Sequence, residues 1–117
     1  MDQAPVLYKR DTNSNKKMRR FIYHLIDPRT REVFYVGQTV DPGQRLKEHV
    51  IGKRSIAVRR NKMAEIIASG QYPIMKTITS ITGTYQDACK IEYEEIARFP
   101  KNQLTNGKHY GKKGIYQ

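Results

Sequence analysis

The sequence predicts a small α+β domain whose elements follow the order strand, strand, helix, helix, strand, helix. A length of 117 residues suits about one domain. Two short apolar segments rich in aromatic and branched residues flank a proline-containing turn, as expected for a hairpin. Three further segments begin at residues that favour helix capping, and a strand-like segment separates the second from the third.

The hairpin is expected near the start of the domain. Phe21–Ile26 is apolar and Val33–Gly37 resembles it, so both are predicted strands. Between them, Asp27-Pro28-Arg29-Thr30 predicts a turn, because proline presets φ at the second turn position and Asp suits the first. The two strands should therefore pair in antiparallel fashion.

The first helix should begin after Asp41, whose side chain can cap free N–H groups, with Pro42 at the first helical position. It should run to about Val50 and end at Ile51-Gly52. The second helix is predicted from about Ser55 to Ser69, with Gly70 as its stop. Its buried stripe should comprise Ile56, Met63, Ile66 and Ile67, and its other face Arg59, Arg60 and Lys62.

The last strand and helix follow from similar signals. Ile74–Thr82 is rich in branched residues and predicts a strand. Thr84 should cap the third helix, with Asp87 as the acid of a capping box. That helix should end near Phe99, because Pro100 cannot continue it.

The composition points to a polyanionic partner. Lys and Arg total 22 against 11 acids, a formal net charge of +11, and basic groups placed on phosphates release counterions. An anionic membrane surface remains an alternative. The one cysteine, Cys89, excludes a disulfide within the chain and a cysteine-rich zinc site. The absence of a long apolar run leads us to expect a soluble, intracellular protein.

The two ends of the chain are predicted to be basic tails, at residues 1–19 and 107–117, around a domain at 20–106. The first is either a solvated leader or a DNA-contacting arm, since composition alone suits both. Candidate DNA-binding residues from this arm and from the second helix are Lys16, Lys17, Arg19, Arg20, Arg59, Arg60 and Lys62.

One acidic residue stands out on the third helix. Ala88, Glu92 and Ile96 follow at steps of four, so Glu92 falls within an apolar stripe. A carboxylate there is costly unless it meets a cation, although a partly exposed edge position is the alternative. Glu94 lies four residues before Arg98 and is expected to form a surface ion pair with it, while Glu95 is expected to be solvated.

Four further residues are candidates for chemistry. Arg45 and His49 lie four apart and should project from one face of the first helix, or else form a solvated edge. Tyr23 and Tyr35 lie on the hairpin, where half-buried strand positions are the alternative. Gly37 can end the second strand or let a phosphate approach the backbone.

Together these residues resemble a known family. Phe21-Ile22-Tyr23, Tyr35-Val36-Gly37-Gln38-Thr39, Arg45 with His49, and Ala88 with Glu92 resemble the GIY-YIG nuclease domain over about residues 20–106. The resemblance implies a three-stranded antiparallel sheet flanked by helices. It also implies that Tyr23 orders or activates the attacking water and that Tyr35 lines the same site. Arg45 would hold the scissile phosphate, and His49 would assist proton transfer to Tyr23.

The resemblance also implies a metal. Glu92 would bind a single divalent ion, Mg²⁺ or Mn²⁺, and Asn106 would buttress the site. Three positions depart from the family pattern: Phe21 replaces the first signature glycine and should face the core, Val33 stands where lysine is common, and Glu95 where an aromatic is common.

The expected function is thus that of a Mg²⁺-dependent DNA endonuclease with a one-metal mechanism, acting on double-stranded DNA. Cutting both strands would need a homodimer or two nicks, since one site cuts one strand. A non-catalytic basic nucleic-acid-binding module is the alternative, and an RNA-directed version of either differs only in substrate.

Overall fold

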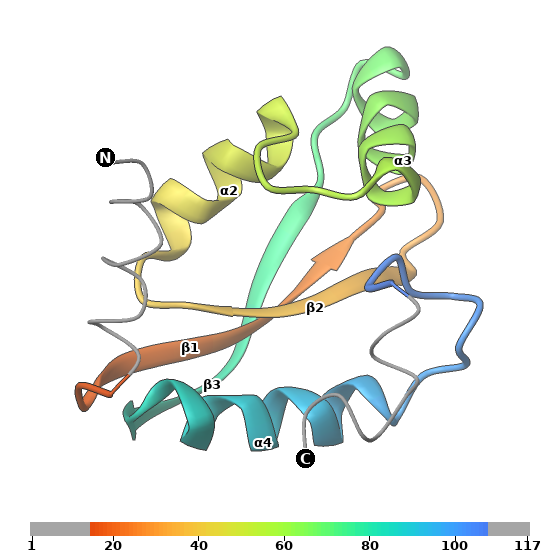
Figure 1. Ribbon diagram of the computed structural model, residues 1–117. Coiled ribbons are helices and arrows are strands. Elements are labelled where there is room, and N and C mark those ends of the chain that lie inside the picture. Colours follow the sequence, from red (N-terminus) through yellow and green to blue (C-terminus); the bar gives the residue numbers. More distant parts are fainter. Residues whose placement is uncertain (1–14, 108–117) are drawn as a thin grey trace.

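A computed structural model describes residues 15–107 of the chain, and its centre is a three-stranded antiparallel sheet (Figure 1). The strands are β1 (Met18–Ile26), β2 (Val33–Thr39) and β3 (Ile74–Gly83), arranged in the order β2-β1-β3. The α+β class, the element order and the antiparallel sheet are therefore confirmed.

The hairpin turn forms at the predicted residues. The Thr30 N–H donates to the Asp27 carbonyl over 3.3 Å, and the Asp27 side chain accepts from the Arg29 N–H at 2.9 Å. The first strand begins earlier than predicted, so β1 takes Met18 and Arg19 from the expected tail. Residues 1–14 and 108–117 of the expected tails lie outside the described part of the chain.

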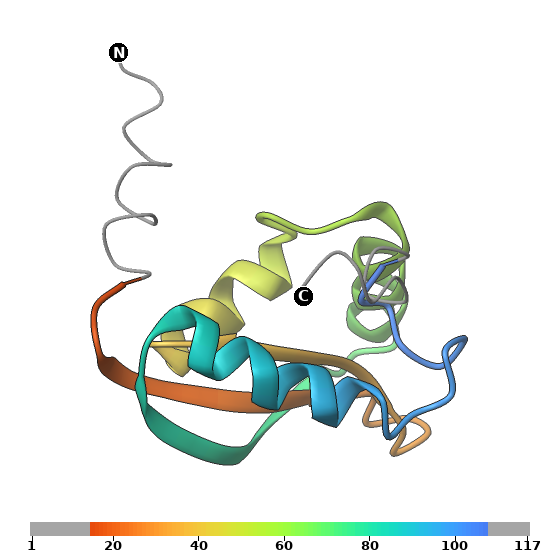
Figure 2. The same ribbon diagram turned by 60° about the horizontal axis from the view of Figure 1, so that its bottom comes forward.

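The helices cover both faces of the sheet. Helices α2 (Pro42–Ile51) and α3 (Ala57–Ala68) lie on one side, and α4 (Tyr85–Ile96) on the other (Figure 1). After a 60° rotation, α4 comes forward and runs across the sheet (Figure 2). Each of these three helices is too short and too polar to span a bilayer, a finding that covers only residues 15–107.

Helix α2 starts and stops where the sequence predicts. The Asp41 side chain accepts from the Gln44 N–H at 3.1 Å, and Pro42 occupies the first helical turn. Gly52 ends the helix with φ of +80°, a left-handed conformation that glycine adopts at little cost. The end of α2 is thereby fixed next to its two buried polar residues, Glu48 and His49.

Helix α3 corrects one part of the predicted core. Ile56 precedes the helix and remains 38% exposed, so its assignment to the buried stripe is wrong. Arg59 takes that place instead, because it precedes Met63 and Ile66 by four and seven residues and shares their side of the helix. All three side chains are buried.

Helix α4 has the predicted capping box. The Thr84 hydroxyl accepts from the Asp87 N–H at 3.2 Å, and the Asp87 carboxylate accepts from the Thr84 N–H at 2.9 Å. The expected Glu94–Arg98 pair is replaced, because Arg98 instead contacts Glu95 at 3.2 Å. Glu95 is only 12% exposed, so the expectation that it is solvated is wrong.

Alternate residues of β1 pack into two separate apolar clusters. Tyr23 and Leu25 join a cluster with residues of α2 and α3, whereas Ile22 joins one with α4. This follows from the two-residue period of a strand, which turns successive side chains to opposite faces. Phe21 is half-buried, and its ring centroid lies 5.7 Å from the Arg19 guanidinium carbon, so this side chain enters the core only in part.

Candidate active site

The two signature tyrosines meet over a glycine. Tyr23 on β1 pairs directly with Gly37 on β2, and its ring lies 6.0 Å from that of Tyr35. A Cβ atom at Gly37 would stand 2.6 Å from both the Tyr23 hydroxyl and the Tyr35 ring. Glycine is thus required here because the two tyrosines occupy the space of a side chain.

His49 closes the space above the tyrosines. Its Nε2 lies 2.8 Å from the Tyr23 hydroxyl oxygen, and its ring packs edge-on against Tyr35 with centroids 5.0 Å apart. Helix α2 delivers this side chain, which is 1% exposed. Nδ1 of the ring is buried without a hydrogen-bond partner among the described residues. No second hydrogen bond therefore pins the ring to one tautomer.

The electrostatics of the site favour a neutral His49. Burial lowers its pKa to about 3, and the charges of Arg45 and Arg59 contribute in the same direction. Burial also raises the pKa of the Tyr23 hydroxyl well above its usual range, although the hydrogen bond and charge of Arg45 oppose this. Both groups are thus uncharged in the free protein near neutral pH.

Arg45 brings a cation to the tyrosines from the same helix as His49. Its charge opposes the rise in the pKa values of Tyr23 and Tyr35 that burial causes. Its Nη1 also contacts the Glu48 carboxylate at 3.0 Å. The predicted common face of Arg45 and His49 is therefore directed at the hairpin.

Glu92 approaches from α4. Its side chain is buried, and its Oε1 accepts from the Gln38 amide at 3.1 Å. The Glu92 charge contributes to raising the pKa values of both Tyr23 and Tyr35, so the carboxylate lies within electrostatic range of the two hydroxyls. The tertiary structure thus gathers Tyr23, Tyr35, Arg45, His49 and Glu92 at one place.

Asn106 supports the site through the backbone of β2. Its side chain accepts from the Val36 N–H at 3.1 Å and donates to the Val36 carbonyl at 2.7 Å. Thr105 continues this pairing, with N–H and hydroxyl donated to the Phe34 carbonyl at 2.7 and 2.8 Å. Residues 105 and 106 therefore satisfy the open edge of β2, where the signature tyrosine Tyr35 lies.

Arg59 belongs to this site rather than to the protein surface. Its guanidinium lies over the Tyr35 ring at 4.3 Å and donates to the Thr105 carbonyl at 2.9 Å. The residue is 6% exposed, so the prediction of a solvent-facing DNA contact is wrong for Arg59. The steps of four and three that join Arg59 to Met63 and Ile66 were the signal for its burial.

Arg20 is also buried, although the sequence predicts it to be exposed. It is 5% exposed, and it donates to the carbonyls of Gly83 at 3.0 Å and Lys16 at 3.2 Å. The reason is strand alternation, which turns Arg20 to the side of Ile22 and away from solvent.

The remaining predicted DNA contacts divide into two groups. Lys62 is half-buried and pairs with the Asp27 carboxylate at 3.3 Å. The exposed members are Lys16, Lys17, Arg19 and Arg60.

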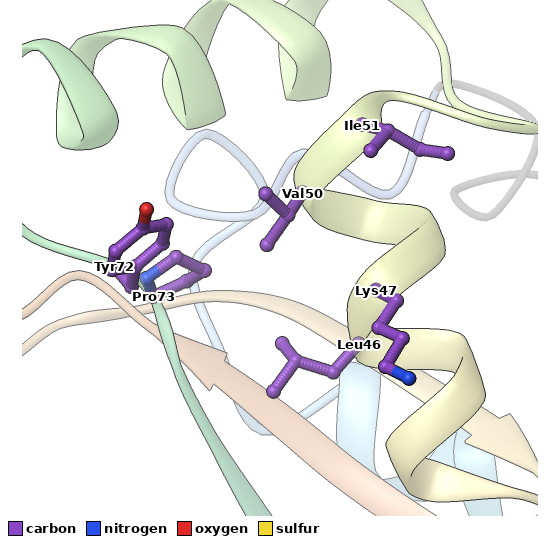
Figure 3. A pocket seen from close by; sticks show the side chains of 6 residues that line it. All are labelled: Leu46, Lys47, Val50, Ile51, Tyr72 and Pro73. Carbon is purple, nitrogen blue, oxygen red and sulfur yellow. The ribbon is translucent and has the colours of Figure 1, made fainter.

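A separate apolar pocket lies beside α2 (Figure 3). Leu46 and Val50 face Tyr72 and Pro73 across it, and none of the predicted site residues lines it. The pocket therefore contributes no group to the cluster around Tyr23.

Comparison with known proteins bears on the same residues. Residues 19–105 match the GIY-YIG catalytic domain, whereas the searches of curated proteins and of solved structures found no significant match. The matched range covers most of the chain and all five gathered residues. The chain therefore belongs to the GIY-YIG nuclease family, whose members hydrolyse phosphodiester bonds in nucleic acid.

Proposed function

We propose that this protein is a Mg²⁺-dependent DNA endonuclease that hydrolyses one phosphodiester bond at the cluster around Tyr23. One observation carries the proposal. The Tyr23 hydroxyl lies 2.8 Å from His49 Nε2 and is acted on by the charge of Arg45, so a proton acceptor and a phosphate-binding cation lie near one oxygen. A module that only binds nucleic acid does not need a buried tyrosine hydroxyl paired with a histidine.

The residues fit a single hard divalent cation. Glu92 supplies one buried carboxylate, and the described residues contain no cluster of three or more ligand-type side chains. Mg²⁺ commonly takes one or two carboxylates and completes its shell with water and phosphate oxygens. When bound, Mg²⁺ or Mn²⁺ would offset the charge that grows on the phosphate.

Arg45 is suited to hold the scissile phosphate. Its guanidinium is planar, permanently charged and fits phosphate oxygens through paired N–H groups. Its charge already acts on the Tyr23 hydroxyl, so a phosphate bound to Arg45 would lie near the proposed proton-transfer pair. Orientation of this kind lowers the barrier because the reacting groups are held together before reaction.

Tyr23 and His49 are proposed to activate the attacking water. Tyr23 would take the water proton while passing its own proton to Nε2 of His49. Arg45 and Arg59 lower the pKa of His49, and an anionic phosphate beside Arg45 would offset part of that effect. Substrate binding would then make His49 a better proton acceptor than it is in the free protein.

The proposed substrate is double-stranded DNA, and the net charge of +11 supports a polyanion. Exposed cations of the described chain, such as Lys17 and Arg60, are available for backbone phosphates. One site cuts one strand, so cleavage of both would take successive nicks or a pair of chains.

The test is nicking of supercoiled plasmid with and without Mg²⁺. We expect metal-dependent nicking by the wild type and none by Glu92→Ala. Glu94→Ala is the matched control, because Glu94 is an exposed carboxylate on the same helix and should cut at the wild-type rate. Equal plasmid binding by all three proteins, with cleavage by none, would overturn the enzyme. Preference for an RNA duplex would overturn the substrate.

A further inference from the structure

Glu48 is a buried carboxylate that the proposed reaction does not use. It lies on α2 between Arg45 and His49 and is 8% exposed. Its Oε1 contacts Nη1 of Arg45 at 3.0 Å and also the Arg54 guanidinium. Its Oε2 accepts from the Gln44 amide at 3.4 Å. One carboxylate thus holds two arginines, of which one reaches the tyrosines.

The contacts around Glu48 restrain the Arg45 guanidinium on several sides. Nη1 of Arg45 also donates to the Lys53 carbonyl at 3.3 Å, and Nη2 to the Arg54 carbonyl at 3.4 Å. The loop after α2 therefore supplies two backbone acceptors in addition to the carboxylate. Two of the five N–H groups, one on Nε and one on Nη2, are then left for a phosphate.

The negative charge of Glu48 suits it to restrain the Arg45 guanidinium. Burial opposes ionisation, but hydrogen bonds from Arg54 and Arg45 outweigh it and lower the pKa of Glu48 to about 2. The carboxylate is therefore ionised at every pH at which a nuclease would be assayed. It balances the charge of Arg45, whose side chain is mostly buried.

Glu48 contrasts with two other acids near α2 and α3, Glu65 and Asp41. Glu65, which pairs with Arg29, is 62% exposed and lies on the outer face of α3. Asp41 caps α2 from an exposed position. Of these three acids, only Glu48 contacts a cation of the catalytic cluster.

We propose that Glu48 is a positioning residue for phosphodiester cleavage: it holds Arg45 where that side chain binds the scissile phosphate. The inference rests on the proposed function. Glu48 acts through Arg45 and does not itself touch the phosphate. Its loss should lower the rate of the bond-breaking step much more than it lowers affinity for DNA.

The first test compares the wild type with Glu48→Gln, which keeps the side-chain size and removes the charge. Single-turnover cleavage of a short duplex with Mg²⁺ should slow by about 10- to 100-fold, since a misplaced catalytic group can cost about 100-fold. Binding of the duplex without metal, followed by fluorescence anisotropy, should change by less than about threefold. Glu94→Gln is the matched control and should cleave at the wild-type rate.

A double-mutant cycle separates positioning from a merely structural role. In an Arg45→Ala background, Glu48→Gln should cause no further loss of rate, because its target is already absent. Millimolar guanidinium ion should restore part of the activity of Arg45→Ala but none in the double variant. This rescue arm holds even where Glu48→Gln lowers stability, provided that circular dichroism shows both proteins folded.

Three outcomes would overturn the inference. Wild-type cleavage by Glu48→Gln would show that Arg45 needs no such support. Equal fold losses in the wild-type and Arg45→Ala backgrounds would point to general destabilisation. An equal loss in Arg54→Ala would mean that Glu48 acts through Arg54. These results differ from failure of the proposed function, in which the wild type itself does not cleave.

Discussion

Two consecutive residues of β1 each contact a titratable partner, on opposite faces of the sheet. Tyr23 faces α2 and reaches His49 at 2.8 Å, whereas His24 faces α4 and reaches the Glu95 carboxylate at 2.8 Å. In the second pair, Glu95 has a further partner, because its carboxylate also contacts Arg98. The first pair is flanked by cations and leaves Nδ1 of His49 without a partner in the described chain.

The difference separates a buried polar pair that should serve stability from one that is proposed to serve chemistry. The Glu95 side chain stabilises His24 by a contact that is already made in the free folded protein. His49 instead lies among groups that lower its pKa, an arrangement that costs stability and suits a substrate that brings negative charge. Variants on the two sides should therefore separate activity from stability.

The largest expected effect is on the Tyr23 side. Tyr23→Phe removes only the hydroxyl, and we expect cleavage to slow by about 10²- to 10⁴-fold, the usual contribution of a positioned proton-transfer group. Single-turnover assays measure this. Tyr72→Phe is the control, because Tyr72 is 67% exposed. Undiminished cleavage by Tyr23→Phe would refute its role in proton transfer.

Next in size is the effect of filling the space over Gly37. In Gly37→Ala the new methyl group would stand 2.6 Å from the Tyr23 hydroxyl, so the tyrosine must move relative to His49. We expect about 100-fold slower cleavage from this displacement, together with a loss of about 1–3 kcal/mol from overpacking. Gly43→Ala offers a comparison, because its nearest neighbour would lie 3.9 Å away. Normal rates in Gly37→Ala would argue against a fixed tyrosine position.

For the His24–Glu95 pair, the expected effect is on stability alone. His24→Ala removes a buried partner of Glu95, and we expect unfolding in urea to require about 1–3 kcal/mol less. The cleavage rate per folded molecule should stay within about twofold, since His24 lies on the face of the sheet opposite Tyr23 and His49. A large loss of rate at full folding would break the proposed division between the two faces.

The smallest effect is a pH dependence that belongs to His49. Its folded pKa of about 3 lies below the ordinary value of 6.5, so the unfolded chain binds the proton first as pH falls. Stability from the neutral ring is full above pH 6.5 and falls by about 1.4 kcal/mol per pH unit below it. Urea unfolding of wild type and His49→Gln at pH 7, 6 and 5 should show a difference that shrinks with acidity. A constant difference would contradict the shift.

The Asp27 carboxylate loses its contribution to folding stability at lower pH than His49 does. A hydrogen bond from Arg29 lowers the pKa of Asp27 from 3.8 to about 2, so its contribution is present above 3.8 and lost as pH falls toward 2. The His49 effect can therefore be measured first, between pH 7 and 5.

Local signals in the sequence predicted most of the fold. Asp41, Gly52 and the Thr84 capping box fixed helix ends within a few residues, because capping depends on neighbours in the chain. Helical spacing also placed Arg45 and His49 on one face, and both meet Tyr23. Arg59 was misplaced because exposure was inferred from its charge, although its spacing to Met63 and Ile66 marked it as buried.

The sequence by itself determined the elements and the family signature, since both depend on residue types at short separations. Only the tertiary structure decided the long-range partners: Asn106 on the edge of β2, Arg59 over Tyr35 and Glu95 beside His24. The physical reason is that these contacts join residues between 24 and 71 positions apart, whose meeting depends on strand register and helix packing. Glu48 shows both kinds of information, because its pairing with Arg45 is local in the chain. The position of this pair near the tyrosines depends on the tertiary structure.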